Sequence, residues 1–208
     1  MNVLERSYYK MLSNTTLTNK LRRIAKLNPL LDDIILFGSV VRGKTKPTDV
    51  DILVLFKNSV DKKTELEVRK ILESHYKNVS IISKTRDMIS DPAFDARESI
   101  FFEGISLLSG NVQSTTYGFS SLGMFRYDFK KWNKLEKTKF YYALNGRGTN
   151  QGIVTKLGCV KFSDNVVLVP LHNIEPFREF MELWRLEYRY IPLLIPERMN
   201  KKKLLTEL

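Results

Sequence analysis

The first half of the sequence predicts an α/β fold, and the second half predicts a smaller α+β arrangement. Short apolar runs rich in Ile, Val and Leu occur at residues 34–37, 50–56 and 79–82. Runs of this length and composition are typical of buried β-strands. Stretches with the apolar spacing of helices lie before and between these runs. Strands that alternate with helices are typical of an α/β domain.

The other elements of the first half follow from the same patterns. Residues 1–14 suggest a short helix or arm, and residues 15–27 suggest a helix with Leu17, Leu21 and Ile24 on one face. The basic side chains on the other faces of this helix would contact a phosphate backbone or simply be solvated. The remaining elements are a helix at 61–75, a third strand at 78–83, a helix at 94–102 and a short edge strand at 105–108.

Two acidic residues accompany the apolar run of the second strand. Asp49 and Asp51 are two positions apart, so on a strand both side chains project from the same face. Two neighbouring carboxylates repel each other and are costly to bury. A hard divalent cation such as Mg²⁺ is a common counter-charge for such a pair. The spacing therefore predicts a metal site at Asp49 and Asp51.

A Gly-Ser pair precedes the two acids. Gly38 at the end of a strand lets the backbone turn tightly and approach a ligand closely. Free N–H groups at the start of a following helical turn favour a phosphate there, and the Ser39 hydroxyl adds a hydrogen bond. A phosphate cradle beside a metal site is the equipment of phosphoryl or nucleotidyl transfer.

Gly38-Ser39, nine further residues and then Asp49-Val50-Asp51 resemble the signature of the DNA polymerase beta-type nucleotidyltransferase superfamily. Arg42-Gly43 and the flanking apolar residues are similar to its minimal prokaryotic and archaeal members. The resemblance covers residues 15–110 and implies a mixed sheet with flanking helices. The alternative interpretation is a Gly-Ser turn followed by a solvated Asp-x-Asp strand end.

The resemblance also implies roles for individual residues. In this superfamily the Gly-Ser turn binds the triphosphate of a nucleoside triphosphate substrate, and the two aspartates hold Mg²⁺ or Mn²⁺. The triphosphate would thus lie at Gly38 and Ser39, and the catalytic metal at Asp49 and Asp51. Two basic side chains of the turn would add positive charge near the phosphates or merely be exposed: Arg42 and Lys44.

The third carboxylate of the superfamily, which helps to activate the attacking hydroxyl, is missing at its expected position, where Ser80 stands. A serine hydroxyl is too weakly acidic to serve as a carboxylate base at neutral pH. Two functions remain open. One is a Mg²⁺-dependent nucleotidyltransferase, and the other is a catalytically degenerate fold that acts as a nucleic-acid-binding or regulatory module. Five later acids could reach the site, and the sequence selects none: Asp87, Asp91, Asp95, Glu98 and Glu103.

The net charge of +11 predicts a polyanionic partner. Residues 1–110 have 18 basic and 14 acidic side chains, whereas residues 111–208 have 16 and 9. We expect nucleic acid, RNA rather than DNA, as the partner or acceptor, although general solubility would also explain the charge. A hydroxyl group on a partner protein is an alternative acceptor within the superfamily.

The sequence predicts a cytoplasmic protein without membrane contact. No apolar run approaches the length needed to span a bilayer, and the N-terminus has no apolar core of signal-peptide length. The single Cys159 excludes an intrachain disulfide and suits a reducing compartment.

A polar, glycine-containing stretch at residues 109–121 marks the expected domain boundary, which gives a nucleotidyltransferase domain at 1–110 and a basic α+β domain at 111–208. The second half contains a hairpin pattern at 159–169, a helix pattern at 175–184 and a strand that Pro192 would break. Aromatic and basic residues alternate near its start, as in surfaces that stack bases and neutralise phosphates, or as in a core strand with exposed lysines. The candidates for nucleic-acid contact are Arg126, Lys130, Lys131 and Trp132.

Overall fold

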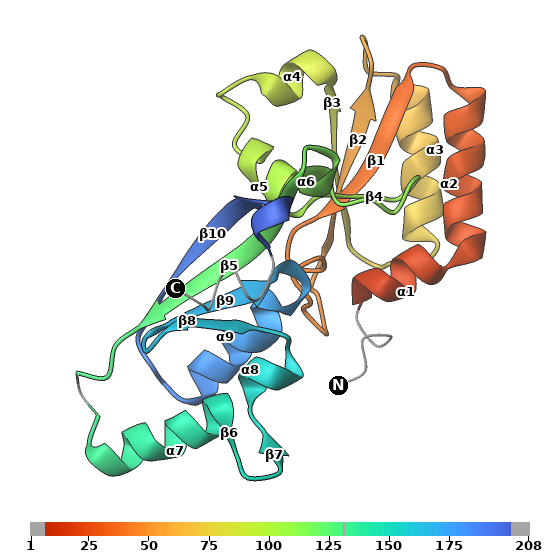
Figure 1. The fold of residues 1–208 in the computed structure, drawn as a ribbon. Helices are drawn as coiled ribbons and strands as arrows, with labels where there is room; N and C mark the ends of the chain where they lie inside the picture. The colour runs from red at the N-terminus through yellow and green to blue at the C-terminus, as the bar shows by residue number, and fades with distance from the viewer. Residues whose placement is uncertain (1–6, 131, 201–208) are drawn as a thin grey trace. The chain divides into compact units, whose positions relative to one another are not determined.

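The computed structural model describes residues 7–130 and 132–200 of the 208-residue chain. The chain divides into two compact units between Tyr117 and Gly118. In Figure 1 the first unit is coloured from red to green and the second from green to blue. The division lies within the polar stretch in which the sequence placed a boundary at 110–111. Each unit has its own sheet, and each is described by itself.

The first unit contains a four-stranded mixed sheet with the strand order β3-β2-β1-β4. β1 is antiparallel to both β2 and β4, whereas β2 and β3 are parallel. This arrangement confirms the predicted α/β class with a mixed sheet. The strands are β1 (Leu31–Phe37), β2 (Val50–Phe56), β3 (Val79–Thr85) and β4 (Ile105–Ser106).

Helices cover both faces of this sheet, with α2 and α3 on one side and α4, α5 and α6 on the other (Figure 1). α2 spans the predicted residues, because the Asn14 side chain caps its first turn by accepting from the Leu17 N–H at 3.0 Å. Asp61 caps α3 in the same way. The helices are α1 (Ser7–Ser13), α2 (Thr15–Leu27), α3 (Lys62–Glu73), α4 (Arg86–Ser90), α5 (Arg97–Glu103) and α6 (Gln113–Thr116).

The core of the first unit follows the alternation of side chains along β1 and β2. Ile35, Phe37, Leu53 and Leu55 point to the side of α4 and α5 and pack with Ile100 of α5. Their neighbours in the sequence point to the opposite side and are also buried, so the two strands are almost continuous apolar runs. The same alternation places Asp33 and Asp51 on the α4–α5 side, at opposite ends of the sheet.

The second unit contains an antiparallel four-stranded sheet with the order β10-β5-β9-β8. Pro192 does not break β10, because β10 lies at the edge of the sheet, where a missing backbone donor is tolerated. The strands are β5 (Phe119–Tyr127), β8 (Val160–Ser163), β9 (Val166–Pro170) and β10 (Tyr188–Pro196), and a short hairpin joins β6 (Gly146–Arg147) to β7 (Asn150–Gln151). The helices are α7 (Lys134–Asn145), α8 (Ile153–Lys156) and α9 (Ile174–Leu183), with 3₁₀ turns η2 (Leu171–Asn173) and η3 (Glu197–Met199).

Aromatic side chains fill the core of the second unit. Phe125 of β5 packs edge to face on Phe177 of α9, with ring centroids 4.9 Å apart. Phe140 of α7 is fully buried. Its ring contacts those of Phe180 and Trp184, toward the C-terminal end of α9. The predicted smaller α+β arrangement is therefore confirmed. Within the described parts of both units, no helix is both long and apolar enough to cross a membrane.

Candidate functional site

The turn after β1 depends on Gly38. Its φ angle is +84°, a backbone conformation that residues with a side chain rarely adopt. A side-chain carbon at this position would also come within 2.5 Å of Oδ2 of Asp51. Glycine therefore serves two purposes here: it permits the turn, and it leaves room for a carboxylate against the backbone.

Several backbone N–H groups of the turn form hydrogen bonds within the turn itself. The N–H groups of Val41 and Arg42 donate to the Gly38 carbonyl at 3.1 and 3.4 Å, and that of Lys44 donates to the Ser39 carbonyl at 3.1 Å. Among residues 7–130 and 132–200, the N–H groups of Ser39 and Val40 have no acceptor. Two unpaired donors in a tight turn form a small concave site for an anion.

Asp49 and Asp51 lie beside this turn. Asp51 is half-buried in β2, opposite Phe37 of β1, and Asp49 is exposed immediately before the strand. Burial, followed by the negative charge of Asp49, raises the pKa of Asp51 above its ordinary value. The negative charge of Asp49 therefore acts on Asp51, although Asp49 precedes β2 and is not part of the strand as the spacing predicted.

Glu103, a buried acid at the end of α5, contacts the Gly38 turn. Oε1 of Glu103 accepts from the Gly38 N–H at 2.9 Å, and Nη1 of Arg42 lies 2.7 Å from both carboxylate oxygens. The side chain of Glu103 is 3% exposed and that of Arg42 is 25% exposed. Arg42 also lowers the pKa of Asp51, against the larger effects of burial and Asp49. The Arg42–Glu103 pair thus holds the Gly38 turn beside the two aspartates.

Glu103 is the residue of the candidate site that the sequence did not select. It was one of five later acids, and the fold brings this one to the site. The signal was available in its surroundings, since Glu103 ends the apolar stretch Ile100-Phe101-Phe102. An acid within such a stretch is expected to be buried with a partner.

Ser80 lies directly opposite Asp51 in the parallel β2–β3 pair and is exposed. The register therefore places a serine, and not a carboxylate, at the position next to Asp51 in β3. Within the described part of the chain, no group of three or more His, Cys, Asp or Glu residues could hold a metal ion. Asp49 and Asp51 therefore stay a predicted pair of metal ligands, without a third acid or histidine grouped with them among the described residues.

This pair fits a magnesium ion that is shared with a substrate. Mg²⁺ is usually held by one or two carboxylates together with substrate phosphates and water. Burial, and then the charge of Asp49, outweigh the effect of Arg42 and raise the pKa of Asp51, so a bound cation would favour the ionised pair. The Ser39 and Val40 N–H groups lie in the adjoining turn, where phosphate oxygens would be needed.

The nucleic-acid candidates of the second unit occupy different environments. Arg126 is exposed on β5, directly opposite Arg189 of β10. Lys130 is exposed and pairs with Asp128 at 3.3 Å. Trp132 is half-buried and packs on Phe129, Phe140 and Trp184. Lys131 lies outside the described residues.

Comparison with known proteins finds a protein family that matches most of the first unit. Residues 18–107 match the family model described as a nucleotidyltransferase domain. This match confirms the resemblance that the sequence predicted, over nearly the same residues. Within the first unit, residues 18–107 are thus similar to nucleotidyltransferase domains. A search of the curated proteins finds no match.

Several solved structures resemble about half of this chain. One, described as a toxin-antitoxin with AMP-PNP, is 24% identical, covers 48% of this chain and 78% of its own, and has a TM-score of 0.34. A complex of a tri-AMPylated Shewanella oneidensis HEPN toxin with its MNT antitoxin is 22% identical, with 49% and 76% coverage and a TM-score of 0.32. A proposed nucleotidyltransferase from Sulfolobus solfataricus is also 22% identical, with 48% and 81% coverage and a TM-score of 0.32.

Proposed function

We propose that the protein transfers a nucleoside monophosphate from a nucleoside triphosphate to an acceptor hydroxyl, and that the reaction depends on Mg²⁺ or Mn²⁺. The observation that supports this proposal is the packing of the Asp51 carboxylate against Gly38. It places a metal-binding group beside a turn with two unpaired backbone donors. Phosphoryl transfer enzymes need both features at adjacent positions.

The hydrogen bonds of the turn support different roles for its residues. The Gly38 N–H is already bonded to Glu103, so the N–H groups of Ser39 and Val40 are the backbone donors for a phosphate. The Ser39 hydroxyl would add a third donor. Lys44, at the end of the turn, would contribute positive charge, whereas Arg42 orients the turn through Glu103.

Asp49 and Asp51 would hold the metal ion. When bound, the ion would neutralise phosphate charge and make the acceptor hydroxyl easier to deprotonate. The residues of this chain would then bind the triphosphate and orient it, and Arg42 would favour the ionised form of Asp51. An acceptor hydroxyl would attack the α-phosphorus, and pyrophosphate would leave.

The missing third carboxylate supports the alternative function, a degenerate fold that binds nucleotide without transferring it. Ser80 cannot replace a carboxylate base, and general base catalysis contributes roughly 10²–10⁴ in rate. Loss of the base therefore slows the reaction without removing the effects of the metal and of substrate positioning. We propose slow transfer as the primary function and a regulatory module as the alternative.

The proposed acceptor is a nucleic acid, RNA rather than DNA, because the chain has a net charge of +11 and the second half has the larger excess. A hydroxyl on a partner protein is the second acceptor class. A cytoplasmic setting is proposed from the single cysteine.

The deciding experiment incubates the protein with α-labelled nucleoside triphosphates and separate RNA and protein extracts. Transfer of label by the wild type, but not by Asp49→Asn, would establish the enzyme and identify the acceptor class. Nucleotide binding without transfer to either extract would favour the regulatory module. Ser80→Asp is the matched gain-of-function variant, since an acid at this position lies opposite Asp51. Faster transfer would show that only the base is missing.

A further inference from the structure

A cavity of about 670 Å³ lies in the first unit on the α4–α5 side of the sheet. Its wall includes the apolar side chains of Ile35, Leu55, Ile89, Ile100 and Phe101. A mostly apolar cavity of this size with a few polar groups is the usual form of a small-molecule site.

The cavity is separate from the nucleotidyltransferase site. It opens at the start of β1, around Asp33, whereas Asp51 lies opposite the end of that strand, at Phe37. Four residues of an extended strand span roughly 13 Å. The cavity is therefore not part of the proposed metal and phosphate site.

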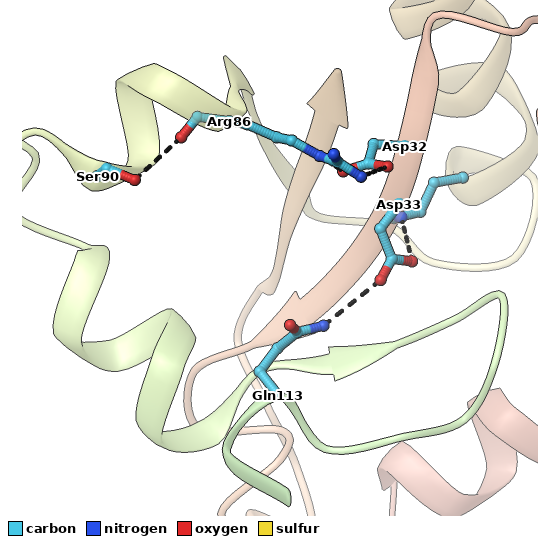
Figure 2. Close-up of polar contacts among 6 residues, drawn as sticks. Asp32, Asp33, Arg86, Ser90 and Gln113 are labelled. Carbon is cyan, nitrogen blue, oxygen red and sulfur yellow. Dashed lines mark hydrogen bonds and ion pairs between the residues drawn. The ribbon is translucent and has the colours of Figure 1, made fainter. Parts of the chain in front are cut away.

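Asp33 is a half-buried carboxylate in the wall of this otherwise mostly apolar cavity, and Figure 2 shows its contacts. Its Oδ1 accepts from the Ser106 hydroxyl at 2.7 Å and from the Ile34 N–H at 2.7 Å, and its Oδ2 accepts from Nε2 of Gln113 at a longer 3.4 Å. All three donors are neutral. Burial raises the pKa of Asp33, although its hydrogen bonds oppose this effect. The carboxylate is thus held in place by neutral donors.

The two arginines of the cavity wall are already paired with other acids. Arg86 forms two hydrogen bonds to Asp32, of 2.5 and 2.6 Å, and Figure 2 shows this guanidinium turned toward Asp32. Arg97 pairs with Glu98 at 3.1 Å. These two pairs cancel in charge, so Asp33 gives the wall a net negative charge in a strongly basic protein.

We propose that this cavity binds a small organic cation, an amine with an apolar body, through the Asp33 carboxylate. The ammonium group would donate to Oδ2, whose one hydrogen bond is long, and the body would lie on the apolar wall. A hydrated metal ion is a poorer match, because it needs several oxygen ligands and the described residues offer no group of three acids or histidines.

The test uses three probes of similar shape: phenethylamine, 2-phenylethanol and 3-phenylpropionate. Each is titrated into the full chain while the ¹⁵N spectrum is recorded, including the side-chain amide of Gln113. We expect saturable shifts at Gln113 and α5 with the amine, and at least about tenfold weaker binding of the neutral and anionic probes. Equal binding of 2-phenylethanol, or no saturable binding of the amine, would overturn the proposal.

Two pairs of variants assign the site. Asp33→Asn keeps an oxygen acceptor for Ser106 and Ile34, and should weaken amine binding about tenfold. Asp87→Asn removes the same charge from an exposed position of α4 outside the cavity wall, and should not change binding.

The second pair remains informative if Asp33→Asn does not fold. Ser90→Trp fills the cavity from α4 and should abolish binding, whereas Ser99→Trp adds the same bulk on an exposed part of α5 outside the wall. Unchanged amine affinity in Asp33→Asn, or amine binding that survives Ser90→Trp, would disprove this assignment.

Discussion

The Asp51 carboxylate occupies the space that a side chain at Gly38 would need, because Oδ2 lies 2.5 Å from where that side chain would begin. The turn and the acid are therefore mutually dependent. Any residue larger than glycine at position 38 must displace the acid, the turn or both.

Replacing Gly38 by alanine should lower stability and remove nucleotide binding. The left-handed backbone conformation costs a residue with a side chain about 1–2 kcal/mol, and the methyl group would also push Asp51 away. Urea denaturation and titration with Mg²⁺ and ATP would measure the two effects.

Gly110→Ala is the matched control. Gly110 has the same φ of +84°, but no atom lies within 4 Å of an added carbon. This variant should show the backbone strain alone and bind nucleotide normally. If Gly38→Ala cost no more than the control and still bound nucleotide, the contact with Asp51 would have no functional role.

Removing the charge of Asp51 should stabilise the protein when no metal is present. Burial and the neighbouring Asp49 raise the pKa of Asp51 above 3.8, so the folded state holds this proton more tightly than the unfolded state does. Stability therefore falls as the pH rises from the unfolded pKa through the raised folded pKa. Asp51→Asn should remove this decline and have the higher melting temperature at neutral pH. Melting curves across this pH range, in chelator, provide the measurement, and a lower melting temperature for the variant would contradict the expected repulsion.

Mg²⁺ with a nucleoside triphosphate should raise the melting temperature of the wild type. A ligand at about 100 times its dissociation constant contributes about 2.7 kcal/mol through linkage. The double variant Asp49→Asn, Asp51→Asn should lose this shift, because no carboxylate remains to hold the ion. A shift of the same size in the double variant would place the metal elsewhere.

Glu103→Gln should destabilise the first unit by about 2–3 kcal/mol, because it removes the charge partner of the largely buried Arg42. Glu98→Gln is its control on the same helix, since Glu98 is 80% exposed and its pair with Arg97 is expected to contribute little. Chemical denaturation of both variants, with an Arg42→Met double-mutant cycle, would measure the coupling. Equal and small effects for the two glutamates would show that the Arg42–Glu103 pair does not hold the turn.

Cys159 should resist alkylation in the folded protein. It is 4% exposed, and burial raises the pKa of its thiol to about 12, so the reactive thiolate is scarce. Because the chain has one cysteine, mass spectrometry after treatment with iodoacetamide gives a direct readout. Denatured protein is the positive control, and equally rapid labelling of folded protein would show that this region opens readily.

In the first unit, the sequence predicted the helices and strands that have a strong local apolar pattern. The three main strands, α2 and α3 follow from apolar spacing and from caps such as Asn14 and Asp61. It missed α4, because this helix has five residues, none of them buried, and so has no apolar stripe. Its cap, Thr85, is the last residue of β3.

The candidate site was only partly readable from the sequence. Spacing placed Asp49 and Asp51 on one side of a strand, and a strand-end glycine predicted the turn. The choice of Glu103 among the later acids depends on how α5 packs against β1, which no local pattern encodes. In the same way, spacing alone could not show that the Trp132 ring packs on Phe140.

The hydrogen bond from Gly38 to Glu103 joins positions 65 residues apart, and this limits how the candidate site can be divided. The segment from β1 to β2 contains the turn and both aspartates, yet it lacks the acid that anchors the turn. A graft of that segment alone into another scaffold would move the turn and the two aspartates without Glu103. A graft that includes the anchor would need the chain from β1 through α5, because Glu103 is the last residue of α5.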